Sequence, residues 1–163
     1  MLGVMSVKKQ VWKTYLFWIL FTEVVGFLSG WLTRESTRLY SETIIQPALS
    51  PPAIVFPIVW TILFALMGIG AARIDLSPTS PKRTQSLRIY IFQLAVNFFW
   101  SIIFFNLQKY GFALLWLVFL WALILRMIGS FRKVDRTAAL LQIPYLLWVT
   151  FAAYLNFGVW VLN

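Results

Sequence analysis

The sequence predicts an all-α integral membrane protein, a single bundle of five transmembrane helices. Of its 163 residues, 61% are hydrophobic and 12% are charged, whereas soluble domains average about 25% charged residues. The apolar residues also gather in five long runs, each close to the ~20 residues that a helix needs to cross a bilayer. A soluble fold of this size could not bury so much apolar surface. An ordinary globular enzyme, a disordered chain and a disulfide-rich secreted domain are therefore excluded.

The predicted spans follow one another with polar connections between them. They cover residues 12–33, 53–72, 87–106, 112–131 and 138–162. We therefore expect a single transmembrane domain over residues 1–163. The longest connection, Arg34–Pro52, is expected to be a loop, since it is polar and ends in a proline pair that stops one element and can start the next. Pro144 falls inside the last run, where it is expected to kink the helix.

Basic residues gather on one side of the predicted bundle. The net charge is +9, from 14 Lys and Arg against 5 Asp and Glu. The N-terminus and the second and fourth connections carry most of this charge: Lys8, Lys9, Lys13, Arg73, Lys82, Arg83, Arg88, Arg132, Lys133 and Arg136. The positive-inside rule then predicts a cytoplasmic N-terminus and an outside C-terminus. Because an anionic leaflet explains this charge, no nucleic-acid partner is expected.

The composition excludes several kinds of catalytic and metal site. The chain has no Cys and no His, which excludes disulfides, Cys/His zinc sites, His-ligated haem and His-based triads. Five acidic residues leave little for a carboxylate metal cage. We expect no metal site, no required cofactor and no conventional enzyme. Glu23, the one carboxylate in mid-span, is expected to be neutral or bonded to another helix, with a proton relay as the alternative.

Aromatic side chains lie deep within three of the predicted spans. Trp60, Trp100 and Trp148 are the deep tryptophans, and polar Asn97 lies near Trp100 in the same span. Helical spacing places these on shared faces with Phe64, Ser101, Phe104, Pro144 and Ala152. The rings either pack the bundle or line one cavity for a flat apolar ligand. Asn97 must find a partner in hydrocarbon, either another helix or a ligand.

A short glycine motif bears on helix packing. Gly26 and Gly30 form GxxxG in the first span, a pattern that lets transmembrane helices approach closely. It favours either a homodimer or close contacts within one bundle.

Three segments carry more specific motifs. They read PPAIVFPIVWTILFALMG at 51–68, NFFWSIIFF at 97–105 and PYLLWVTFAAYLN at 144–156. Together, and in this order, they resemble the TspO/MBR family of bacterial tryptophan-rich sensory proteins and mitochondrial translocator proteins, also called peripheral-type benzodiazepine receptors. With five spans in matching order, the resemblance covers nearly the whole chain.

The resemblance implies a five-helix bundle, commonly a homodimer, with a pocket under the first loop. Members bind porphyrins such as protoporphyrin IX, cholesterol-like lipids and benzodiazepine-type ligands. Some promote light-dependent porphyrin breakdown, for which Trp60 and Trp148 are the catalytic candidates here. Leu49 stands where many members have a tryptophan, so one loop wall lacks its ring. Spacing and resemblance together give the expected ligand-binding residues: Trp60, Phe64, Asn97, Trp100, Ser101, Phe104, Tyr145, Trp148 and Ala152.

These expectations combine into one functional hypothesis. We expect a membrane receptor or sensor that binds tetrapyrroles and other apolar ligands in an aromatic intramembrane pocket, with porphyrin as a ligand and membrane lipids around it. The alternatives are light-dependent porphyrin degradation and transport of small hydrophobic molecules or lipids. A bacterial inner membrane is expected, because no mitochondrial presequence is visible.

Overall fold

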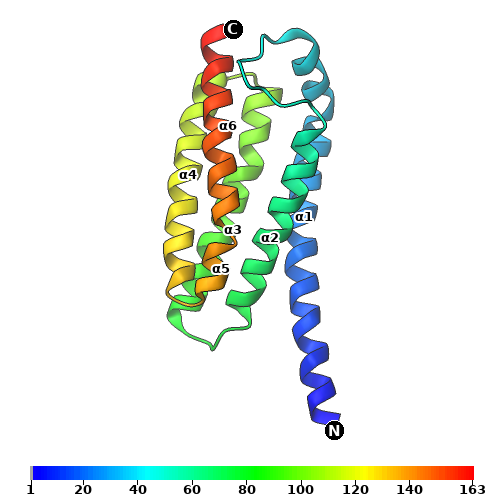
Figure 1. Cartoon of the computed structure of the whole chain (residues 1–163), viewed down its shortest axis with the longest axis vertical. Helices are drawn as coiled ribbons and strands as arrows, with labels where there is room; N and C mark the ends of the chain where they lie inside the picture. The colour runs from blue at the N-terminus through cyan, green and yellow to red at the C-terminus, as the bar shows by residue number, and fades with distance from the viewer. Residues whose placement is uncertain (1) are drawn as a thin grey trace.

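The computed structural model describes residues 2–163, and the side chains from residue 10 onward. Within these residues, five helices are long and apolar enough to cross a membrane (Figure 1). They are α1 (Leu2–Thr43), α2 (Val55–Asp75), α3 (Pro81–Ser101), α4 (Tyr110–Arg132) and α6 (Ile143–Leu162). A π-helical turn, η1 (Ile102–Asn106), extends α3, and the short helix α5 (Arg136–Leu140) precedes α6. The chain is thus a multi-pass membrane protein, and the predicted fold class is confirmed.

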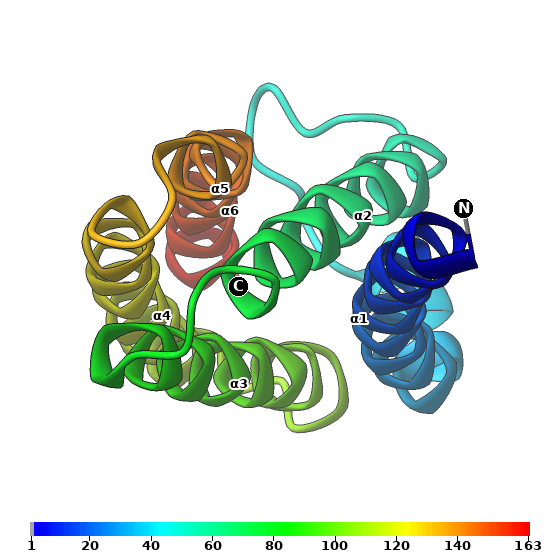
Figure 2. The same ribbon diagram turned by 90° about the horizontal axis from the view of Figure 1, so that it is seen from below.

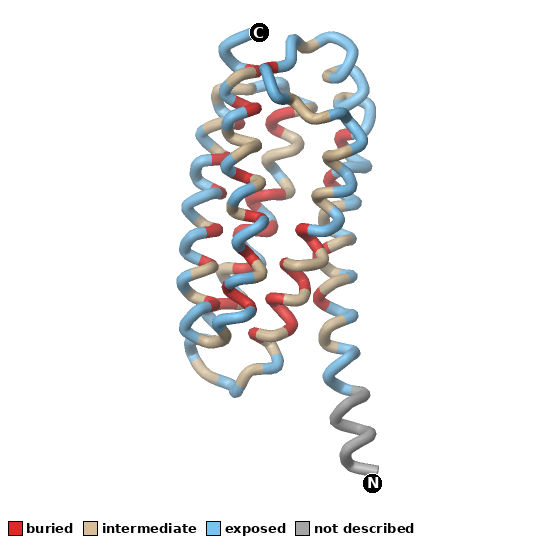
Figure 3. Tube along the Cα trace, viewed as in Figure 1, coloured by how far each residue is buried: buried red, intermediate tan, exposed pale blue. Residues whose placement is uncertain are grey.

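The helices form a ring in which α2 lies inward (Figure 2). Helix α1 packs against α2 and α3, α3 packs against α4, and α4 packs against α6. Helix α2 packs chiefly against α1 and touches α6 at few points. Figure 3 shows buried residues on the faces turned toward other helices. The outward faces carry exposed apolar side chains such as Phe27, Leu115 and Leu147, as expected where a bundle meets lipid.

The first connection is shorter than the sequence suggested. The prediction of a loop from Arg34 is wrong, because α1 continues to Thr43 and the loop occupies residues 44–54. Glu35 lies 3.8 Å from Arg38, and this exposed i, i+3 ion pair favours continued helix. The first residue able to stop the helix is Pro47. The change from apolar to polar residues at Arg34 therefore does not coincide with the end of α1.

The last span is interrupted rather than kinked. Helix α5 ends at Leu140, and α6 begins at Ile143. Pro144 lies in the first turn of α6, where its missing N–H breaks no helical hydrogen bond. The expected kink at Pro144 is therefore wrong. At the break, Gln142 is fully buried and its Nε2 donates to the carbonyl oxygen of Ala138 at 3.1 Å.

One end of the bundle, which we call the basic end, holds the connections 76–80 and 133–135. Two carboxylates tie the helices together there. Asp75 accepts a hydrogen bond from Trp18 Nε1 of α1 at 3.0 Å and forms a salt bridge with Arg83 of α3. Asp135 lies 2.8 Å from Arg73 of α2 and also caps α5. Both acids of this end are thus paired. Lys8 and Lys9, used to predict the orientation, lie outside the described side chains.

The pair of Arg73 and Asp135 predicts an acid-sensitive basic end. Although burial opposes ionisation, hydrogen bonds from the Ala138 N–H and from Arg73 lower the pKa of the Asp135 carboxyl below its usual value. Since the folded-state pKa is lower than the unfolded one, the stability is present above about pH 4 and is lost as the pH falls through the lowered pKa. We expect Asp135→Asn to flatten the acid side of the thermal-unfolding profile in detergent, whereas Glu42→Gln, an exposed control, keeps the wild-type profile. Identical acid profiles for Asp135→Asn and wild type would contradict this assignment.

Candidate functional site

Three predicted aromatic residues meet between α2 and α6. The rings of Trp60 and Phe64 are stacked with centroids 5.2 Å apart, one helical turn from each other on α2. Tyr145, in the first turn of α6, meets Trp60 edge-on at 6.2 Å. The Phe64 ring also covers Gly26 of α1, where an added Cβ would lie 2.1 Å from Phe64 Cε2. Gly26 therefore serves a contact within one bundle, while Gly30 faces open space.

A buried chain of hydrogen bonds joins α3 to this aromatic contact. Asn97 Nδ2 donates to the Tyr145 hydroxyl at 2.7 Å, and that hydroxyl donates to Gln93 Oε1 at 3.0 Å. Asn97, Gln93 and Tyr145 are each at most 5% exposed. Of the two alternatives left open for Asn97, the structure shows a bond to another helix. We call Trp60, Phe64, Gln93, Asn97 and Tyr145 the central group.

Trp148 lies on the same helix as Tyr145, one turn further along. Its ring meets Phe56 of α2 edge-on at 5.9 Å and Phe151 at 5.6 Å. Trp60 and Trp148 are both half-buried, so part of each ring surface is left uncovered. Aromatic side chains therefore bridge α2 and α6 where the two helices make few direct contacts.

Trp100 and Phe104 form a second aromatic cluster. Their rings are stacked at 5.2 Å, and Phe104 also packs against Tyr40 at 5.5 Å and Tyr110 at 5.1 Å. Trp100 Nε1 donates to Asn156 Oδ1 at 3.3 Å. Trp100 also packs against the main core, which links this cluster to the central group.

The remaining two predicted residues are Ser101 and Ala152, which take part in fewer of these contacts. Ser101 and Ala152 are half-buried. Ala152 packs against the main core, as Trp148 does.

The connection 44–54, which we call the lid loop, is fastened to α6 at the end that carries the C-terminus (Figure 1). The Tyr154 hydroxyl donates to the carbonyl oxygen of Ala48 at 2.9 Å, and the Asn163 side chain bonds both the N–H and the carbonyl of Ile45 at 3.0 Å. Pro47 is buried against Gly158, where an added Cβ would lie 2.4 Å from Pro47 Cβ. Leu49 is 79% exposed, with φ of 66°. The lid loop thus closes this end of the bundle.

Two polar members of the site were missed at the level of sequence. Gln93 lies one turn before Asn97, so a polar pair at i and i+4 in an apolar span was the available signal. Asn156 stood in a recognised motif, but its hydrogen bond to Trp100 joins residues 56 positions apart. Phe56 of α2 contacts Trp148 of α6. Residue spacing within one helix cannot predict a contact between two helices.

Known proteins are similar to this chain over most of its length. Residues 18–161 match the family model described as the TspO/MBR family. Tryptophan-rich protein TspO of Chlorobaculum tepidum is 38% identical over 85% of this chain and 89% of its own length. Protein CrtK of Rhodobacter capsulatus is 37% identical over 78% of this chain and 81% of its own length. The translocator protein of Bos taurus is 31% identical over 91% of this chain and 89% of its own length. A family match over most of the chain and relatives above 30% identity lead to one conclusion: the chain belongs to the TspO/MBR family.

Proposed function

We propose that the protein is a membrane receptor or sensor that binds flat, apolar ligands of the tetrapyrrole class between α2 and α6. The observation that carries the proposal is the aromatic seam between these helices. Trp60 and Trp148 are only half-buried, and the two helices meet mainly through rings. Ring faces suit planar conjugated ligands through offset and edge-on contacts. The names of the relatives, a tryptophan-rich sensory protein of Cereibacter sphaeroides among them, support a sensory role.

The polar part of the central group suits orientation rather than acid–base chemistry. Asn97, Gln93 and Tyr145 supply neutral donors and acceptors. Gln93 Nε2 is buried and has no hydrogen-bond partner among the described residues. A few fixed polar groups in an apolar pocket orient a ligand without contributing catalysis. Any light-dependent breakdown of porphyrin would then draw its chemistry from the excited ligand and oxygen, with Trp60 and Trp148 beside it.

We also propose how the protein lies in its membrane. The described basic end carries Lys82, Arg88, Arg132, Lys133 and Arg136, and the positive-inside rule assigns it to the cytoplasm of a bacterial cell. The lid loop then faces outward. Gly30, open on α1, leaves that helix available for a homodimer contact.

The first experiment is a titration of protoporphyrin IX into detergent-purified protein in the dark, followed by tryptophan quenching. We expect saturable binding by the wild type. Trp148→Phe and Trp60→Phe should bind roughly three- to tenfold more weakly, because a smaller ring loses part of the stacking contact. Trp12→Phe is the matched control, since Trp12 is 52% exposed near the far end of α1.

The outcomes separate the proposed site from its alternatives. Equal affinity in all three variants would place the porphyrin elsewhere, and absence of saturable binding would reject the tetrapyrrole class. Illuminating the bound samples tests degradation separately. Product formation that is lost in Trp148→Phe at saturating ligand would favour the degradation alternative over a purely sensory role.

A further inference from the structure

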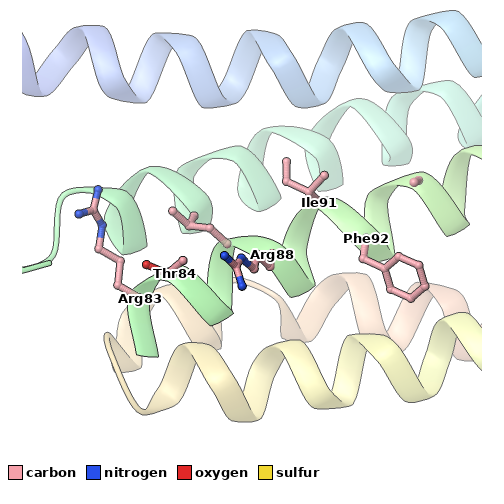
Figure 4. A pocket seen from close by; sticks show the side chains of 7 residues that line it. Arg83, Thr84, Arg88, Ile91 and Phe92 are labelled. Carbon is pink, nitrogen blue, oxygen red and sulfur yellow. The ribbon is translucent and has the colours of Figure 1, made fainter. Parts of the chain in front are cut away.

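An open groove runs along α3 near the basic end (Figure 4), and no member of the central group lines it. Its volume is about 580 Å³. Its lining comes from successive turns of α3: Arg83, Thr84, Leu87, Arg88, Ile91, Phe92 and Ala95. A second hollow continues from Thr84 and Arg88 toward Thr79 and Ser80. The two together form one surface that extends from the connection before α3 into its apolar part.

The groove changes polarity along its length at Arg88. Toward the start of α3 its lining is mostly polar, with Arg83 and hydroxyl side chains such as Thr84 beside Leu87. Beyond Arg88 it is lined by Ile91, Phe92 and Ala95, which are all exposed. Phe92 is held edge-on against Phe119 of α4, with ring centroids 6.3 Å apart. The groove thus offers a polar section, a cation and an apolar section in turn. A phospholipid presents a polar headgroup, an anionic phosphate and apolar acyl chains in the same order.

Of the two guanidinium groups that line the groove, that of Arg83 is paired with Asp75, whereas that of Arg88 is not neutralised by the protein. Asp75 and Asp135 are the acids of the basic end, and they are paired with Arg83 and Arg73. Among the described side chains, Arg88 takes part in no salt bridge, and it is exposed. A guanidinium with no partner acid can bind phosphate oxygens through paired N–H donors.

The position of Arg88 fits the boundary between headgroups and hydrocarbon. The span Pro81–Asn106 has 26 residues and is about 39 Å long at ~1.5 Å per residue. The hydrocarbon core is only about 30 Å thick, so the first turns of α3 reach into the headgroup layer. Arg88 lies seven residues after Pro81, and its long side chain can extend toward that layer.

We propose that this groove binds one anionic glycerophospholipid from the leaflet at the basic end. Arg88 holds the phosphate, the hydroxyl-lined section faces the headgroup, and one acyl chain lies over Ile91, Phe92 and Ala95. A zwitterionic lipid is disfavoured because its ammonium group would lie near the unpaired guanidinium of Arg88. Basic pockets at the cytoplasmic ends of transmembrane helices bind such headgroups in other membrane proteins.

The test is a titration of the detergent-purified full chain with dioleoylphosphatidylglycerol, read by native mass spectrometry and by the thermal-unfolding temperature. We expect saturable binding that is about tenfold weaker in Arg88→Gln, because a charge-assisted hydrogen bond to phosphate is lost. Arg132→Gln removes the same charge at the same end but outside the groove, and should change affinity by less than about twofold. Ala95→Trp fills the apolar section and should also weaken binding, whereas Val118→Trp, on the exposed face of α4, should not.

Three results would overturn the proposal. Equal binding of dioleoylphosphatidylcholine would show that the charge is not recognised. An equal loss in Arg132→Gln would reduce the effect to overall charge. Inorganic phosphate that competes with the lipid at similar concentrations would indicate an anion site instead. If Arg88→Gln fails to fold, Ala95→Trp carries the test of the groove, with Val118→Trp as its control.

Discussion

Replacing Gly68 by alanine is expected to destabilise the bundle by about 3 kcal/mol, because the new methyl group overpacks a tight contact. An added Cβ at Gly68 would lie 2.6 Å from Ile19 Cα and 2.8 Å from the carbonyl oxygen of Trp18. Both are backbone atoms of α1, so no side chain can turn away to make room. The two helices must separate, which also strains the hydrogen bond from Trp18 to Asp75.

Gly129→Ala provides the matched control for that substitution. Gly129 lies in α4 with no atom within 4 Å of an added Cβ. Alanine there should raise stability by roughly 0.5–1 kcal/mol through its better helix propensity. Unfolding in detergent, followed by circular dichroism for both variants, measures the difference. A Gly68→Ala protein as stable as the wild type would contradict the close packing of α1 on α2.

Tyr145→Phe is expected to cost about 2 kcal/mol of stability, because two buried polar groups lose one partner. Asn97 Nδ2 and Gln93 Oε1 both bond the Tyr145 hydroxyl, at 2.7 and 3.0 Å. The ring itself stays, so the contact with Trp60 is retained. The same unfolding measurement in detergent reports the loss.

A double-variant cycle separates the hydrogen bond from any change in packing. Adding Gln93→Leu to Tyr145→Phe removes both partners, so the combined loss should be smaller than the sum of the single losses. Tyr154→Phe, which removes an exposed hydroxyl bonded to Ala48, should cost much less. Strict additivity would mean that the bond between Tyr145 and Gln93 contributes nothing to stability.

The span count and fold class could be predicted because hydropathy and length decide them. A run such as residues 112–131 has few polar interruptions, and the structure places α4 at Tyr110–Arg132. Asn97 could be predicted to need a partner, since an amide in hydrocarbon cannot be left without one. These predictions rest on forces that act along a single helix.

Helix ends and contacts between helices could not be predicted in the same way. Helix α1 passes Arg34 because polar residues do not stop a helix, and the exposed pair of Glu35 and Arg38 has the helical i, i+3 spacing. Pro144 begins a helix rather than bending one, because the chain breaks at Gln142 just before it. Spacing placed Trp60 and Trp148 on their helices, but it could not show that Trp60 meets Tyr145 while Trp148 meets Phe56. Such pairings depend on how two helices are rotated toward each other.

The fastening of the lid loop to α6 fixes an order of events during biosynthesis. The loop follows α1 directly, yet its hydrogen-bonding partners lie 106 and 118 residues further along the chain. While the ribosome is still making α3 and α4, the loop has neither Tyr154 nor Asn163 to bind. Closure of this end must therefore wait for the insertion of α6. A chain that has not yet inserted α6 lacks both of these fastenings of the lid loop.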